Sequence, residues 1–203
     1  ILVITPLNVY GNFLKLNTPA KQVILYDHGL KKVLFEKNSN DFMKPASMAK
    51  IMTAYIVFDR LQEGSLSLND TFVVSKNAWK KGGSRTFLKL NSEVTISDLL
   101  MGLIVQSGND AAIVLAEGIA GSEEDFAIQM NQYANSLEMK NTYFTNSTGW
   151  PHEDLKTTAY DLIILTEALI NNFPSLYKLF LEKEFTFNKI RQSNRNPLLI
   201  GRY

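Results

Sequence analysis

Residues 45–61 constrain the fold most, because they predict a long helix that is apolar on almost every side. Pro45 suits the first turn of a helix, where the missing N–H has no intrahelical partner in any case. Gly64 ends the stretch, since glycine readily adopts the left-handed conformation found just after a helix. A helix that is apolar nearly all round is expected to be buried. The rest of the chain therefore has to supply the elements that bury it.

Further helical patterns follow this stretch. Thr95 and Ser122 stand in N-cap positions, and acidic residues follow Ser122 in the first turn of its helix. A glycine-bearing break at residues 106–108 interrupts what would otherwise be one longer helix. The predicted helices cover residues 95–105, 109–119, 122–138, 157 or 158 to 171 and, as a short one, 174–181.

The strand patterns lie mainly at the two ends of the chain. Residues 1–19 are predicted to be an irregular lead-in, and residues 20–27 and 31–37 form a β-hairpin around a turn that contains His28. Short strands are predicted at 71–74 and 86–90, an extended stretch at 141–145, and an alternating strand at 183–188. The fold class is therefore α+β. We expect one antiparallel sheet that the hairpin begins and residues 184–187 continue.

The composition excludes several kinds of binding and catalytic site. A chain of 203 residues with 45% apolar residues can bury a core without disulfides, and it has no cysteine with which to form one. The net charge of +1 gives no support for a nucleic-acid partner. Only two histidines occur, which excludes a His-rich metal site and leaves few bases for a Ser-His-Asp triad. A hydrolase of this composition is expected to use another base.

Ser47 and Lys50 lie in the first turn of the buried helix. Residues three apart share one face, with Cβ atoms about 5–6 Å apart. The helix start favours developing negative charge. Apolar neighbours such as Met48 and Ile51 would lower the pKa of the lysine, because burial disfavours the ammonium form. The pair is a candidate nucleophile and base. The alternative is a buried helix start whose lysine reaches out to solvent.

Ser107-Gly-Asn109 is the second candidate. It lies in the break between the apolar runs 99–105 and 111–115, and small polar groups in a buried turn need hydrogen-bond partners. The alternative is an N-cap formed by Asn109 or Asp110. The same short pattern also occurs at Ser67 and Ser75, in ordinary loop contexts.

Other residues with chemical potential are interpreted as structural. Ser175-Leu-Tyr-Lys178 repeats the Ser-x-x-Lys spacing after Pro174, and we interpret it as a capping serine and a solvated lysine. His28 is interpreted as a turn residue and His152 as a loop residue.

Taken together, these patterns resemble a known family. Ser-x-x-Lys and Ser-x-Asn are two of the three signatures of penicillin-binding proteins and serine β-lactamases. Longer stretches are similar to D-alanyl-D-alanine carboxypeptidases of the low-molecular-weight penicillin-binding class. These are Pro45-Ala-Ser-Met-Ala-Lys-Ile-Met-Thr-Ala-Tyr55, Gln106-Ser-Gly-Asn-Asp-Ala-Ala112 and Phe185-Thr-Phe-Asn-Lys-Ile-Arg-Gln-Ser-Asn-Arg-Asn196. The resemblance covers residues 20–203 and implies a β-lactamase/DD-peptidase-like fold, with the sheet packed against a large helical region.

The resemblance implies a role for each matching residue. Ser47 would be the acylated nucleophile and Lys50 its base. Ser107 would relay a proton to the leaving D-alanine, bonded to Lys50 or Asn109, while Asn109 would hold both Lys50 and the substrate amide. The backbone N–H of Ser47 would give half of the oxyanion hole.

Gly108 and Arg195 are the implied substrate-binding residues. Arg195 matches a family arginine near the substrate carboxylate, and the alternative is a solvated surface arginine. The implied activity is that of a serine-type D-Ala-D-Ala carboxypeptidase of peptidoglycan biosynthesis and cell shape, without metal or cofactor. Its partners would be peptidoglycan stem peptides, and β-lactam antibiotics as inhibitors. The resemblance also implies export to the periplasm or the outer face of the cytoplasmic membrane.

The third family signature, Lys-Thr-Gly, does not occur in the 203 residues. Lys156-Thr-Thr158 is a near match, but it opens a predicted helix. The resemblance therefore implies a partial catalytic domain over residues 20–203, truncated before that strand, the last sheet strands and a membrane-associating C-terminal segment. Because a hairpin and one strand make a poor sheet, we expect the chain to be unstable by itself. The alternative function is that of a catalytically incomplete fragment.

A third hypothesis is a serine β-lactamase. Glu167-Ala-Leu-Ile-Asn171 resembles the pattern that supplies the deacylating glutamate of class A enzymes. It lies 60 residues beyond Ser107, inside a regular helix, which is too far for that class. We interpret Glu167 as an exposed helical residue.

Overall fold

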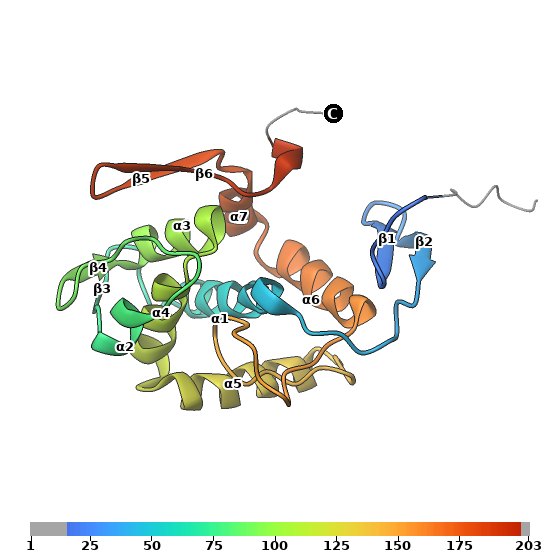
Figure 1. Ribbon diagram of the computed structural model, residues 1–203, viewed down its shortest axis with the longest axis horizontal. Coiled ribbons are helices and arrows are strands. Elements are labelled where there is room, and N and C mark those ends of the chain that lie inside the picture. Colours follow the sequence, from blue (N-terminus) through green and yellow to red (C-terminus); the bar gives the residue numbers. More distant parts are fainter. Residues whose placement is uncertain (1–15, 200–203) are drawn as a thin grey trace, which may run out of the picture.

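The buried helix predicted from the sequence lies at the centre of the molecule. A computed structural model describes residues 16–199. Helix α1 (Lys50–Glu63) follows a 3-10 turn, η1 (Ala46–Ala49), and its residues 52–58 are all buried. It contacts α3 (Ile96–Gln106), α4 (Asn109–Ala120), α5 (Glu123–Ser136) and α6 (Ala159–Asn172), which surround it in Figure 1. The prediction that this helix is covered by the others is confirmed.

Hydrogen-bonding caps fix where three of these helices begin. The hydroxyls of Thr95, Ser122 and Thr158 each accept a hydrogen bond from the backbone N–H three residues later, at 3.0–3.1 Å. Each such bond satisfies one of the free N–H groups of a helix start. The predicted starts of α3, α5 and α6 are therefore confirmed. A short helix α2 (Lys76–Lys80) was not predicted, while α7 (Pro174–Tyr177) and the 3-10 turn η2 (Lys178–Leu181) were.

Strands β1 (Val23–Asp27) and β2 (Lys32–Lys37) pair antiparallel and confirm the predicted hairpin. Strand β3 (Thr71–Val73) pairs with β4 (Glu93–Thr95), not with the strand predicted at 86–90. That strand prediction is wrong, because the backbone N–H groups of Thr86 and Leu88 donate to the buried carboxylate of Asp110 and not to a neighbouring strand. At 141–145 the extended stretch is confirmed by a bridge from Tyr143 to Lys156.

The prediction that a single sheet joins both ends of the chain is also wrong. Strand β5 (Glu184–Phe187) pairs with β6 (Ile190–Ser193), a strand that was not predicted. Asn188 and Lys189 between them both have positive φ, at 48° and 66°, which suits the tight two-residue turn of a hairpin. Figure 1 shows β5–β6 lying beside α3, while β1–β2 lies beside α6. In the described part of the chain the strands therefore form three two-stranded sheets.

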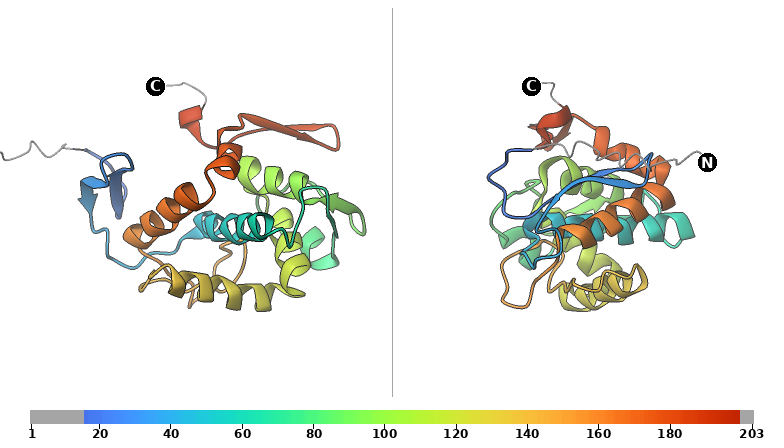
Figure 2. Two further views of the ribbon diagram at one scale, coloured as in Figure 1. Left: turned by 180° about the vertical axis from the view of Figure 1, so that it is seen from behind. Right: turned by 90° about the vertical axis from the view of Figure 1, so that its right-hand side faces the viewer.

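The two hairpins occupy different parts of the molecule in every view (Figure 2). The α+β class is confirmed, with helices as the bulk of the fold. Of the predicted lead-in, residues 1–15 lie outside the described residues, and 16–19 carry no helix or strand, so the division at residue 20 stays a prediction. Across 16–199, no helix combines the length and apolar character needed to cross a membrane.

Candidate active site

Ser47 and Lys50 lie where the 3-10 turn η1 passes into α1. Ser47 is exposed, whereas Lys50 is only 5% exposed. The Lys50 Nζ donates to the Ser47 Oγ at 3.3 Å and to the backbone carbonyl of Thr148 at 2.8 Å. The lysine therefore does not reach out to solvent, and that alternative is wrong. An accessible hydroxyl paired with a buried amine is the geometry that a serine nucleophile and its base require.

The pKa of Lys50 is low enough for it to act as a base. Burial is the largest cause and the positive charge of Arg195 is the second, and they lower the pKa of Lys50 from 10.5 to about 8. The carboxylates of Asp110 and Glu123 oppose this shift. Desolvation dominates because a buried ammonium loses its hydration without gaining a carboxylate in direct contact. A substantial neutral fraction of Lys50 is therefore present near pH 8.

The two predicted sequence patterns meet at one small cavity. Its volume is about 110 Å³, and Ser107 at the end of α3 lines it together with the Ser47–Lys50 pair. The remaining lining residues are apolar: Ile51, Leu103, Ile104 and Phe180. A larger hollow of about 500 Å³, which includes Arg60 and Asp70, contains none of the predicted site residues. Helices α1 and α3 thus bring together two patterns that lie 60 residues apart.

Ser107 holds an unusual backbone conformation. Its φ of 60° and ψ of 39° place it in the left-handed region, where it ends α3. Such a conformation costs a residue other than glycine about 1 kcal/mol or more, and strain of this kind concentrates at functional sites. Gly108 then begins α4, and a Cβ there would lie 2.2 Å from the Thr86 Oγ1. The close approach explains why position 108 has no side chain.

Asn109 is 6% exposed and faces the loop before Thr86. Its Nδ2 donates to the Gly82 carbonyl at 2.7 Å, and its backbone N–H to the Ser84 carbonyl at 2.8 Å. The N-cap alternative is wrong, because neither Asn109 nor Asp110 caps α4 with its side chain. Among residues 16–199, no hydrogen bond joins Lys50 to Asn109 or to Ser107, so the contacts expected from the family are not formed here.

Arg195 follows β6 and reaches across to the same loop. Its Nη1 donates to the Ser84 Oγ at 2.5 Å, and its backbone N–H to the Val105 carbonyl at 3.3 Å. The side chain is exposed but anchored, and its charge acts on the pKa of Lys50. Arg195 is therefore held at the loop that also contacts Asn109.

The loop at residues 145–150 is a part of the site that sequence reasoning missed. The Asn146 Oδ1 accepts hydrogen bonds from Thr148 and Trp150, which shapes the turn that presents the Thr148 carbonyl to Lys50. Gly149 has a φ of 76°, and a Cβ at this position would lie 1.7 Å from the Ala46 carbonyl oxygen. The glycine that follows the polar run Thr145–Thr148 was the available signal for a tight turn in the sequence.

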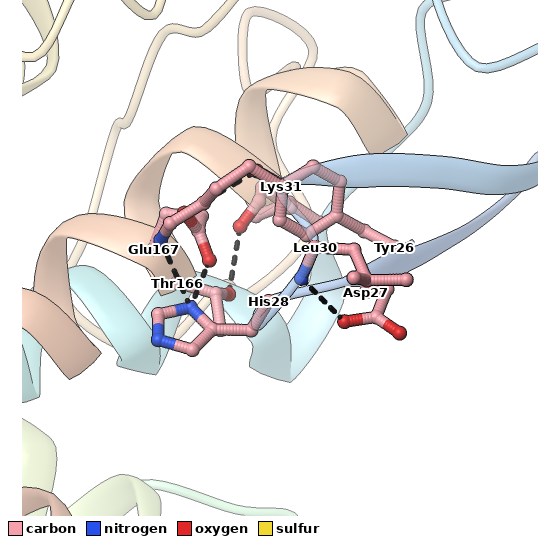
Figure 3. Close-up of polar contacts among 8 residues, drawn as sticks. Tyr26, Asp27, His28, Leu30, Lys31, Thr166 and Glu167 are labelled. Atoms are coloured by element: carbon pink, nitrogen blue, oxygen red, sulfur yellow. Dashed lines mark hydrogen bonds and ion pairs between the residues drawn. The ribbon is translucent and has the colours of Figure 1, made fainter.

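Glu167 lies at a different place from the candidate nucleophile. Figure 3 shows it on α6, where it faces the turn of the β1–β2 hairpin. Its carboxylate accepts hydrogen bonds from His28, from the Lys31 Nζ at 2.6 Å and from the Tyr26 hydroxyl at 3.4 Å. The interpretation as an exposed residue is wrong, since the side chain is 19% exposed. Glu167 attaches the hairpin to the helical region, and His28, in the predicted turn, takes part in this contact.

Glu167→Gln is expected to loosen the hairpin by about 1 kcal/mol, because an amide cannot pair with the Lys31 cation. Burial raises the pKa of Glu167, but hydrogen bonds from Lys31 and His28 outweigh it and hold the pKa below 4.5. This contribution is therefore present above pH 4.5 and is lost as the pH falls through the lowered pKa. Amide hydrogen exchange of residues 23–37 at pH 7 should become several-fold faster. Equal acceleration in the exposed control Glu153→Gln would contradict the contact.

No cluster of three His, Asp or Glu side chains that could hold a metal ion occurs in the part of the chain the structure describes. His152 lies exposed in its loop, and Ser175 belongs to α7 and does not line the cavity of Ser47. The polar side chains that line the cavity are the hydroxyls of Ser47 and Ser107 and the amine of Lys50.

Known proteins of one family are similar to this chain in sequence. The family described as D-alanyl-D-alanine carboxypeptidase matches residues 13–203. The D-alanyl-D-alanine carboxypeptidase DacC of Escherichia coli is 45% identical over 186 residues, which cover 89% of this chain and 46% of that protein. The chain therefore spans about half of that relative's length.

Two solved structures are similar as well. Penicillin binding protein 5 from Haemophilus influenzae has a TM-score of 0.86 and 37% identity, with 91% of this chain and 56% of that chain covered. Penicillin-Binding Protein D2 from Listeria monocytogenes, in an ampicillin-bound form, has a TM-score of 0.81 and 25% identity, with 92% and 76% covered. With its sequence match, its fold and its paired serine and lysine, the chain belongs to the D-alanyl-D-alanine carboxypeptidase family.

Proposed function

We propose that these residues form the nucleophile-bearing part of a serine-type D-Ala-D-Ala carboxypeptidase that acts on peptidoglycan stem peptides. One observation carries the proposal. The exposed Ser47 hydroxyl lies 3.3 Å from the Nζ of a buried lysine whose pKa is about 8. Family membership supports the choice of reaction, since the DacC relative is named for the same activity.

The reaction begins with proton transfer from the Ser47 Oγ to the neutral Lys50 Nζ. The Oγ attacks the carbonyl carbon of the penultimate D-alanine, and the backbone N–H of Ser47 stabilises the developing oxyanion. The amide bond breaks, and the terminal D-alanine leaves with a proton relayed through Ser107. Water then hydrolyses the acyl-Ser47 ester. This sequence needs no metal ion or cofactor.

Asn109, Gly108 and Arg195 would orient the substrate. The Asn109 side chain lies at the start of α4, and we assign it to the substrate amide, with the backbone of Gly108 beside it in the same turn. Arg195, anchored on Ser84, is assigned to the substrate carboxylate. The Asn109 Nδ2 donates to the Gly82 carbonyl, which leaves the Asn109 Oδ1 as the acceptor for a hydrogen bond from the Lys50 Nζ on substrate binding.

β-Lactams are proposed as inhibitors because they present a strained amide to the same serine. The similarity to the ampicillin-bound Listeria protein supports this assignment. Because stem peptides lie outside the cytoplasmic membrane, the protein would act in the periplasm or at the outer face of the cytoplasmic membrane. Association with that membrane is part of the same proposal. The β-lactamase hypothesis has no support in the geometry, since Glu167 is bonded to the β1–β2 hairpin.

Labelling with a fluorescent penicillin tests the proposal. The protein expressed from its complete gene should acquire one label, and mass spectrometry should place it on the peptide that contains Ser47. Ser47→Ala should remove the label, while Ser175→Ala, the serine of the second Ser-x-x-Lys, should leave it. Absence of label on the wild type, or label retained in Ser47→Ala, would contradict the proposal. An unlabelled, correctly folded protein would favour the catalytically incomplete fragment.

A further inference from the structure

A second layer of residues lies behind Lys50. The Thr148 carbonyl accepts a hydrogen bond from the Lys50 Nζ at 2.8 Å, and the Ser147 carbonyl accepts one from the Thr53 Oγ1 at 2.7 Å. Lys50 and Thr53 are one turn apart on α1, so the two carbonyls fasten the 147–148 segment along one face of the helix. All four residues are at most 5% exposed. The position of the Lys50 amine therefore depends on how firmly this segment is held.

Glu123 holds the segment from its other side. This residue begins α5, where the helix start favours a carboxylate. Its Oε1 accepts hydrogen bonds from the Ser147 backbone N–H at 3.1 Å and from the Ser147 Oγ at 2.6 Å. Hydrogen bonds to a charged acceptor are stronger than neutral ones. A chain of contacts thus runs from Glu123 through Ser147 and Thr148 to the amine of Lys50.

We propose that Glu123 is a positioning residue for the Lys50 base, acting through the Ser147–Thr148 segment and through its charge. This inference rests on the proposed function, in which Lys50 deprotonates Ser47. Glu123 does not line the cavity, so it would not touch the substrate. Glu123 has two effects that different substitutions can remove. Its carboxylate oxygen holds the 147–148 segment, and its negative charge favours the ammonium form of Lys50.

The charges around Lys50 come from three other elements. Arg195, after β6, lowers the pKa of the lysine, and Asp110 on α4 and Glu123 on α5 raise it, against the dominant effect of burial. Asp110 is committed to the backbone N–H groups of Thr86, Leu88 and Ala111, so its removal would disturb the fold. Glu123 is the carboxylate whose charge can be removed while an acceptor oxygen stays in place.

The experiment compares the pH dependence of acylation by benzylpenicillin in the complete gene product and in three variants. Glu123→Gln keeps an oxygen that can accept from Ser147 but loses the charge. Glu123→Ala loses both. Glu124→Gln removes the same charge from the exposed neighbouring position and serves as the matched control. Thermal unfolding of each variant is measured in parallel.

In Glu123→Gln, the acidic limb of the rate profile is expected to shift to lower pH while the high-pH rate stays within about twofold. In Glu123→Ala, the high-pH rate is expected to fall roughly 10- to 100-fold, because a small displacement of a base is costly. Glu124→Gln should match the wild type. If Glu123→Ala does not fold, the shift in Glu123→Gln decides alone.

If the acidic limb of the rate profile does not shift in Glu123→Gln, the inference is overturned, even if Glu123→Ala is slower. A purely structural residue would lower the rate without changing the pH dependence. The same holds if both variants match the wild type. Failure of the wild type to react with benzylpenicillin would instead contradict the proposed function, so the two failures are distinguishable.

Discussion

Lys50→Met is expected to reduce the rate of Ser47 acylation by benzylpenicillin roughly 10²- to 10⁴-fold, the usual contribution of a positioned general base. Methionine has a similar volume and is apolar, so it can fill the buried space of the lysine. It cannot accept a proton from the Ser47 Oγ, which lies 3.3 Å from the Lys50 Nζ in the wild type. Stopped-flow or quenched labelling with the wild type as reference measures the loss.

The wild-type rate should depend on pH through the same group. Only neutral Lys50 accepts the proton, so acylation should rise with pH and reach half of its maximum near pH 8, where burial places the pKa. Lys50→Met should lack this limb. A variant that retains the wild-type rate, or a wild-type profile that is flat between pH 6 and pH 10, would show that another group is the base.

Lys50→Met should lose activity without losing stability at neutral pH, because the same buried charge affects folding differently. Between pH 8 and pH 10.5 the native lysine is neutral while the unfolded one is protonated, so the unfolded state binds more protons and wild-type stability rises with pH. Below pH 8 both states carry the charge, and burial of the ammonium is a cost that methionine removes. Urea unfolding at pH 7 should therefore show Lys50→Met at least as stable as the wild type. A loss well above 1 kcal/mol would mean that the bond to the Thr148 carbonyl outweighs desolvation.

Features that depend on neighbours in sequence were predictable. The three-residue spacing of Ser47 and Lys50 fixes their proximity, because one helical turn brings such side chains together. The caps at Thr95, Ser122 and Thr158 follow from the hydrogen bond that a hydroxyl offers to a backbone N–H of its own helix. Burial of α1 follows from its apolar surface alone.

Features that depend on contacts distant in sequence were not predictable from the pattern. Thr148 reaches Lys50 across 98 positions through a backbone carbonyl, which every residue type offers equally. Glu167 resembled a catalytic motif, yet its partners lie 136 to 141 positions away on the β1–β2 hairpin. The β5–β6 turn at Asn188 and Lys189 requires positive φ at a lysine, which is uncommon, so the pairing of Glu184–Phe187 was assigned to the wrong sheet.

Gly149→Ala is expected to cost roughly 4 kcal/mol or more of unfolding free energy and to abolish rapid acylation. Two effects combine at this position. A φ of 76° disfavours any residue with a Cβ, and that Cβ would lie 1.7 Å from the Ala46 carbonyl oxygen, a backbone atom that cannot turn aside. The loop or the η1 turn would have to move, and both hold atoms that position Lys50 and Ser47.

Gly64→Ala separates the two effects. Gly64 has nearly the same φ, 75°, at the end of α1, but nothing lies within 4 Å of a Cβ built on it. Only the conformational strain then applies, about 1–2 kcal/mol, and the site should react at the wild-type rate. Urea unfolding and penicillin labelling of the two variants should therefore differ sharply. Equal losses of stability, or a Gly149→Ala protein that is acylated as fast as the wild type, would mean that the 145–150 loop does not press on the turn that carries Ser47.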